Sequence, residues 1–176
     1  MKFINILIVL SLLSFLSCTK KEEKVEIIID DVIETQMLES YKKGLKALDE
    51  GDALYAARHF TDAELLFPQS EWAPKSLLMA AYSYYSQDYF ADAIAELERF
   101  IKTYPQSNRL DYAYFLLATC YYEKIIDEKK DLEPLIKAKD TFKFVIQEYP
   151  STDFALDAKF KFNLIDETLA GKEMYI

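Results

Sequence analysis

Few residues in this chain belong to the types that commonly carry catalysis or bind metals. His59 is the only histidine, so a two-histidine metal site and a multi-histidine relay are both excluded. Three glycines are too few for a glycine-rich loop that cradles phosphate. The paired acids Glu22-Glu23 and Asp30-Asp31 fall in a charged N-terminal stretch, and we interpret them as solvated charge. The sequence therefore predicts no enzyme, and neither a metal nor a cofactor site.

One cysteine has a sequence context that does predict chemistry. Met1-Lys2 is a short positive start, and residues 3–16 are almost wholly apolar. This pattern is typical of a secretory signal peptide and is short for a membrane span. Residues 15–18, Phe-Leu-Ser-Cys, resemble the bacterial lipobox, in which the cysteine is acylated. We predict a lipoprotein signal peptide over residues 1–17 and a lipid on Cys18.

An ordinary signal peptide with a fortuitous cysteine is the alternative. The lipoprotein is favoured because Cys18 ends the apolar run and polar residues 19–24 follow at once. We predict that residues 18–35 form the lipidated N-terminus and a linker. By resemblance to lipoprotein sorting signals, Thr19 in place of aspartate predicts the outer membrane, on its periplasmic face. With Cys18 acylated, Cys120 has no disulfide partner and is predicted to be a small buried hydrophobe.

The composition indicates a globular chain that does not bind nucleic acid. Hydrophobic residues make up 51% of the 176 residues, which is enough to fill a core. The formal net charge of −9 repels phosphate backbones. Thirteen tyrosines and twelve phenylalanines indicate aromatic packing between helices, or a surface that holds peptide.

The strongest internal signal is a repeat that emerges when the chain is aligned on its prolines. An alanine, a large apolar residue and a proline recur with identical spacing: Ala56, Phe60 and Pro68; Ala93, Leu97 and Pro105; Ala138, Phe142 and Pro150. Small residues stand at equivalent upstream positions: Gly44, Ala81 and Ala118. The pattern resembles the tetratricopeptide repeat, which has two helices per unit. The small residue lets the first helix approach the second, the large residue fills the groove between them, and the proline ends the second helix.

We therefore predict an all-α array over residues 36–176. It comprises about three and a half tetratricopeptide-like helical hairpins stacked in a right-handed superhelix. The predicted helices span 36–50, 53–67, 71–87, 89–104, 108–124, 135–149 and 153 to the end. Serines or threonines are placed to cap the helices that follow the prolines: Ser70, Ser107 and Ser151 or Thr152. Extra residues between Tyr122 and Ala138 are predicted to lengthen the turn inside the third repeat.

The first helix of a repeat can carry a second apolar stripe. In the second repeat Leu77, Ala80, Ala81 and Tyr84 form the packing stripe, whereas Leu78, Tyr82 and Tyr85 form another, offset around the helix. By resemblance to tetratricopeptide proteins, the second stripe faces a concave groove. The candidate groove residues are Tyr41, Leu78, Tyr82, Tyr85, Tyr112, Phe115 and Tyr122, with Leu38, Leu45 and Leu48 beside them. A tyrosine-rich wall suits peptide segments, but rings that simply pack against neighbouring repeats are an equal alternative.

Several stretches resemble the BamD (ComL-like) family of outer-membrane assembly lipoproteins. They are residues 81–85 (Ala-Tyr-Ser-Tyr-Tyr), Asp88-Tyr89 with Ala93, residues 99–101 (Arg-Phe-Ile), Tyr104-Pro105 followed by residues 111–114 (Asp-Tyr-Ala-Tyr), and Leu169-Ala170 with Glu173-Met174. The family has five repeats, and the apolar end after Gly171 lacks a capping face. By this resemblance, the chain is expected to be the front part of a longer protein, truncated after the start of the fourth repeat.

The resemblance implies a scaffold of the machinery that folds β-barrel proteins into the outer membrane. Its implied partners are the barrel-forming assembly subunit, accessory lipoproteins and unfolded β-barrel proteins, together with the membrane through the lipid. The alternative is another envelope tetratricopeptide lipoprotein that acts as an adaptor in cell-wall synthesis or division. Both need a lipid anchor and a groove, so composition does not separate them.

The lipid anchor gives the first testable prediction. Cys18→Ala should abolish lipid attachment and leave the protein uncleaved or mislocalised, because the acylated sulfur is lost. Metabolic labelling with a fatty-acid probe measures this directly. Labelling of the variant at the wild-type level would contradict the prediction.

Overall fold

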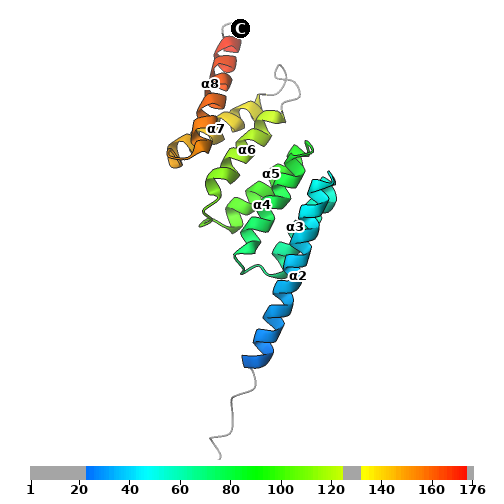
Figure 1. The fold of residues 1–176 in the computed structure, drawn as a ribbon. Helices are drawn as coiled ribbons and strands as arrows, with labels where there is room; N and C mark the ends of the chain where they lie inside the picture. Colours follow the sequence, from blue (N-terminus) through cyan, green and yellow to red (C-terminus); the bar gives the residue numbers. More distant parts are fainter. Residues whose placement is uncertain (1–22, 125–131, 174–176) are drawn as a thin grey trace, which may run out of the picture. The chain divides into compact units, whose positions relative to one another are not determined.

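The computed structural model describes residues 23–124 and 132–173, and the regular structure within those ranges is entirely helical (Figure 1). The helices are α2 (Glu23–Asp49), α3 (Ala53–Leu66), α4 (Trp72–Tyr85), α5 (Phe90–Thr103), α6 (Leu110–Glu123), α7 (Glu133–Glu148) and α8 (Asp153–Glu173). The chain divides into two compact units, Met1–Thr35 and Gln36–Ile176, and the packing described below belongs to the second.

The first helix begins earlier than the sequence predicted. α2 starts at Glu23, whereas we predicted a linker up to residue 35 and a helix from residue 36. The physical reason is that this stretch contains no helix breaker, since no proline occurs between residues 23 and 49 and no glycine precedes Gly44. The predicted signal peptide and Cys18 lie outside the described residues.

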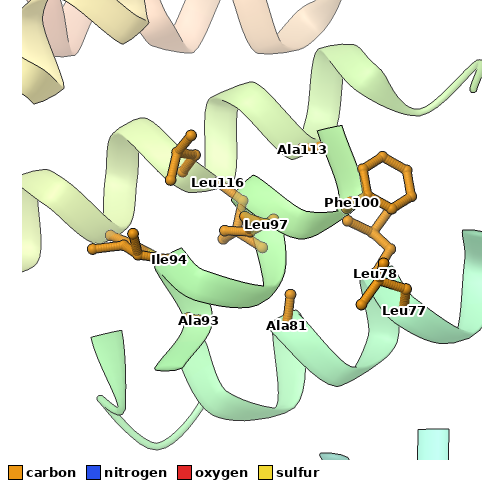
Figure 2. Close-up of a cluster of buried hydrophobic side chains, with 11 residues drawn as sticks. Leu77, Leu78, Ala81, Ala93, Ile94, Leu97, Phe100, Ala113 and Leu116 are labelled. Carbon is orange, nitrogen blue, oxygen red and sulfur yellow. The ribbon is translucent and has the colours of Figure 1, made fainter. Parts of the chain in front are cut away.

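The two-helix repeat is confirmed by the packing of its marker residues. From α3 onward each helix packs against the next one along the chain. The three alanines of the pattern, Ala56, Ala93 and Ala138, and the three large residues, Phe60, Leu97 and Phe142, are all fully buried. In the second repeat, Leu97 of α5 lies between the helix that carries Ala81 and the helix that carries Leu116 (Figure 2). The large residue therefore joins its own repeat to the next.

Gly44 allows a close approach between the paired helices of the first repeat. A Cβ built on Gly44 would lie 2.8 Å from the ring of Phe60, closer than a side chain tolerates. Phe60 cannot move away easily, because it is fully buried among residues of α2, α3 and α4. In later repeats, Ala81 and Ala118 occupy the equivalent position and are also fully buried.

The turns between repeats share one geometry. The backbone N–H groups of Ser70, Ser107 and Thr152 donate to the carbonyls of the aromatic residues three positions earlier, at 3.0–3.1 Å. Thr152 also caps α8, since its hydroxyl accepts from the N–H of Ala155 at 3.2 Å. The cap predicted at Ser70 is wrong: its hydroxyl instead donates back to the carbonyl of Phe67, and α4 begins without a side-chain cap. Ser107 accepts from the N–H of Arg109 at 3.3 Å, immediately before α6, while Arg109 itself provides no side-chain cap. Pro134 falls in the first turn of α7 as predicted, while residues 125–131 of the lengthened turn lie outside the described part.

A buried carboxylate connects the first two repeats. Glu64 on α3 is 3% exposed, and its Oε1 accepts hydrogen bonds from Arg99 of α5 at 2.9 Å and from the Tyr104 hydroxyl at 3.0 Å. A second guanidinium nitrogen of Arg99 lies 2.7 Å from Glu64 Oε2. Burial and the bond to Glu64 raise the pKa of Tyr104 to about 12, so its phenol stays protonated and donating. This network fixes α5 relative to α3, the second helices of the first two repeats.

The contact at Gly44 predicts that a glycine-to-alanine substitution destabilises the protein at Gly44 but stabilises it at Gly171. Gly44→Ala should lower the free energy of unfolding by about 1 kcal/mol or more, because overpacking outweighs the gain in helix propensity. Gly171→Ala is the matched control: its Cβ would meet nothing within 4 Å, so only the propensity gain of about 0.5–1 kcal/mol applies. Chemical denaturation measures both, and an unchanged stability for Gly44→Ala would contradict the packing.

Candidate functional site

A cavity of about 450 Å³ lies between the N-terminal parts of α4 and α6. Both helices are the first of their repeats, and the cavity opens on the face where the sequence placed the second apolar stripe. Its lining residues are Glu71, Pro74, Lys75, Leu78, Met79, Tyr82, Ser107, Asn108, Arg109 and Tyr112. Apolar side chains therefore form much of its wall, while charged groups stand at the helix starts.

Three of the predicted groove residues come together in this cavity. Leu78 is only 8% exposed and packs into the core, so it presents one side to the cavity. Tyr82 is 37% exposed, and its ring centroid lies 6.3 Å from that of Tyr85. Burial, together with the nearby phenols of Tyr82 and Tyr85, raises the pKa of Tyr112 to about 12. The three phenols are thus neighbours, and Tyr112 stays protonated and able to donate a hydrogen bond at neutral pH.

The other predicted groove residues pack against protein. Tyr41 is buried, and its ring meets those of Phe60 and Trp72 edge-on at 5.2 Å. Phe115 packs against Phe142 of α7 and against Phe154 of α8, at centroid distances of 6.0 and 5.5 Å. The rings of Tyr41 and Phe115 therefore pack between helices, which is the alternative that the sequence left open.

The remaining tyrosines take intermediate positions. Tyr122 is half-buried against the third core cluster, and Lys161 Nζ lies 5.2 Å from its ring centroid. Tyr85 is half-buried and packs on Phe90 at 6.1 Å. The candidate groove is therefore shorter than predicted and is centred on Tyr82 and Tyr112.

A second cavity adjoins the first at Tyr82. It has a volume of about 380 Å³ and lies where α2 and α4 end, lined by Leu45, Leu48, Asp49, Tyr82, Ser86 and Gln87. Leu45 is 43% exposed, as expected for a residue on the open face. Because Tyr82 lines both cavities, they form one surface that crosses α4, which we call the tyrosine groove.

Sequence reasoning missed the charged residues of this groove. Lys75 and Glu71 continue the Leu78–Tyr82 stripe backward at helical spacing, so extending the stripe to polar residues would have found them. The ammonium of Lys75 lies 4.4 Å from the Trp72 ring centroid and 5.4 Å from that of Tyr41. Arg109 precedes α6 in an inter-repeat turn, where no periodic pattern marks it.

The arrangement suits binding rather than bond-making. Within the described residues no group of three histidine, cysteine, aspartate or glutamate side chains could hold a metal ion. Cys120 is buried as predicted, and burial raises the pKa of its thiol to about 12, so it is not a nucleophile at neutral pH. Apolar walls with tyrosine hydroxyls and a few charges can receive an extended segment of another chain. None of the described helices is both long enough and apolar enough to cross a membrane.

Comparison with known proteins gives consistent matches along the chain. The family model described as YfiO, outer membrane lipoprotein, matches residues 33–176. The outer membrane protein assembly factor BamD of Caulobacter vibrioides is 35% identical over 173 residues, which cover 98% of this chain and 56% of that protein. BamD of Rickettsia prowazekii is 35% identical over 136 residues, covering 77% of this chain and 54% of that protein. The chain thus spans about half the length of the curated relatives it matches.

Solved structures confirm the fold. The first TPR of Spaghetti (RPAP3), bound to the HSP90 peptide SRMEEVD, has a TM-score of 0.58 at 20% identity and covers 78% of this chain and 95% of that chain. The first TPR domain of human RPAP3 has a TM-score of 0.57 at 21% identity, covering 81% of this chain and 99% of that chain. The helical hairpins are therefore tetratricopeptide repeats.

Proposed function

Because the chain belongs to the YfiO family of outer membrane lipoproteins, we propose that it is a lipid-anchored scaffold for the assembly of β-barrel proteins in the outer membrane. The relatives from Caulobacter vibrioides and Rickettsia prowazekii are both outer membrane protein assembly factors. This chain spans about half of their length, so the activity and the partners of the whole protein are part of this proposal.

The proposed anchor is a lipid on Cys18, after removal of residues 1–17. Apolar residues 3–16 followed by a cysteine and then by charged residues support it. The several acyl chains of a bacterial lipoprotein hold a membrane firmly, whereas a single chain does so only marginally. The anchored protein would face the periplasm, which suits a chain that acts on envelope proteins.

The tyrosine groove is the observation that carries the proposed role. It offers an exposed ring at Tyr82, a half-buried donor at Tyr112 and apolar floor residues such as Leu78. An unfolded β-barrel protein is made of segments that alternate apolar and polar residues, and many carry aromatic side chains. One such segment in extended form could place a ring beside Tyr82 while its backbone carbonyls accept from tyrosine hydroxyls. The proposed partners are unfolded β-barrel proteins, the barrel-forming assembly subunit and accessory lipoproteins.

This role is that of a scaffold and not of an enzyme. It needs no cofactor, because holding a segment depends on contact area and hydrogen bonds rather than on an activated group. The net charge of −9 disfavours nucleic acid as a partner.

The proposal predicts that Tyr82 contributes strongly to peptide binding. Tyr82→Ala should weaken binding of a peptide from the C-terminal strand of a β-barrel protein about thirtyfold, because a buried aromatic contact is worth about 2 kcal/mol or more. Fluorescence anisotropy with the labelled peptide measures the dissociation constant.

Tyr55→Ala serves as the matched control for this experiment. Tyr55 is 51% exposed on α3 and lines neither cavity, so its removal should leave the dissociation constant unchanged. Circular dichroism must show that both variants are folded. Equal binding by wild type and a folded Tyr82→Ala variant would reject the groove as the binding surface.

A further inference from the structure

The two cavities of the tyrosine groove carry opposite charge. The cavity between α4 and α6 is lined by two cations, Lys75 and Arg109, against one anion, Glu71. The cavity where α2 and α4 end is lined by Asp49 and by no cation. The net charge of the chain is −9, so the excess of positive charge in this cavity is opposite in sign to the charge of the chain as a whole.

The helix ends reinforce this difference. The first cavity lies at the N-termini of α4 and α6, where the helix ends carry partial positive charge. α4 has no side-chain cap, whereas at α6 the Asp111 carboxylate accepts from the N–H of Tyr112 at 2.7 Å and offsets part of that charge. The second cavity lies at the C-termini of α2 and α4, where Ser86 and Gln87 follow the last turn and the partial charge is negative. Within each cavity, the side-chain charges and the helix ends thus have the same sign: positive in the first cavity and negative in the second.

We propose that the tyrosine groove holds a peptide segment in one orientation, with its acidic end between Lys75 and Arg109 and its basic end beside Asp49. This inference rests on the proposed function and adds a charge requirement for the bound segment. Tyr82, which lines both cavities, separates the two ends and contacts the middle of the segment.

The dimensions define the length of that segment. A helix rises about 1.5 Å per residue, so Lys75 and Ser86 are about 16 Å apart along α4. An extended peptide covers this distance with about five residues. The recognised element is therefore a short extended segment with apolar or aromatic residues between charges of opposite sign.

The test uses peptides of about eight residues with blocked ends, alternating aromatic residues and threonine. The dipolar peptide has lysine at one end and aspartate at the other, and the parent has glutamine and asparagine there. Two exposed ion pairs should strengthen binding about threefold to tenfold at low salt, and added salt should remove the gain. A photo-cross-linker beside the aspartate should label residues 107–112, and one beside the lysine should label residues 45–49.

Charge-exchanged variants make the orientation falsifiable. Arg109→Glu combined with Asp49→Lys keeps the net charge and gives each helix end a charge that suits its dipole, so the fold should survive. In this variant the two cross-linking patterns should exchange. Arg58→Glu with Glu148→Lys, on the exposed surfaces of α3 and α7, is the control and should keep the wild-type pattern.

The outcomes separate this inference from the proposed function. Binding of both peptides with equal affinity and with cross-links spread over both ends would overturn the orientation while leaving the groove in place. A pattern that does not exchange in Arg109→Glu/Asp49→Lys would overturn it equally. Failure of the parent and the dipolar peptide alike to bind would reject the peptide groove itself, and the orientation with it.

Discussion

The close approach of the two helices in each repeat is the contact on which the rest of this structure depends. Phe60 reaches full burial because Gly44 has no side chain in its way, and Leu97 and Phe142 do the same opposite Ala81 and Ala118. Because proteins pack at near-crystalline density, this spacing leaves little freedom in how one helix crosses the next. The orientation of α2, α4 and α6, and hence the tyrosine groove on their shared face, follows from it.

The fold could be predicted from sequence because its determinants are local and periodic. The alanine, large residue and proline of each repeat recur at fixed spacing, and each has a packing or backbone role that does not depend on distant residues. Helix starts were less predictable. α2 extends back to Glu23 because nothing stops it, and Ser70 turns its hydroxyl back into the preceding turn rather than onto α4. Both outcomes depend on competition between local hydrogen bonds, which a single sequence does not resolve.

The candidate site was predictable only in part, for a geometric reason. Helical spacing placed Tyr41, Tyr82 and Tyr112 on the same kind of stripe, but it did not say which neighbour would cover each ring. Tyr41 meets Phe60 and Trp72 and is core, whereas the equivalent face of α4 stays open at Tyr82. Arg109 could not be found from periodicity because it lies in a turn. The Glu64–Arg99–Tyr104 network could not be predicted from periodicity either, because it joins residues far apart in the sequence.

A groove built on rigid helices suits a scaffold that must hold many different unfolded chains, since aromatic walls tolerate varied side chains while backbone hydrogen bonds are common to all. Site-specific photo-cross-linking in living cells tests this account most directly. A photoreactive phenylalanine analogue in place of Tyr82 should form adducts with newly made β-barrel proteins. The same analogue in place of Tyr55, which is exposed on α3 and lines neither cavity, should form none. Adducts of equal yield from both positions, or none from position 82 in a folded and anchored protein, would contradict it.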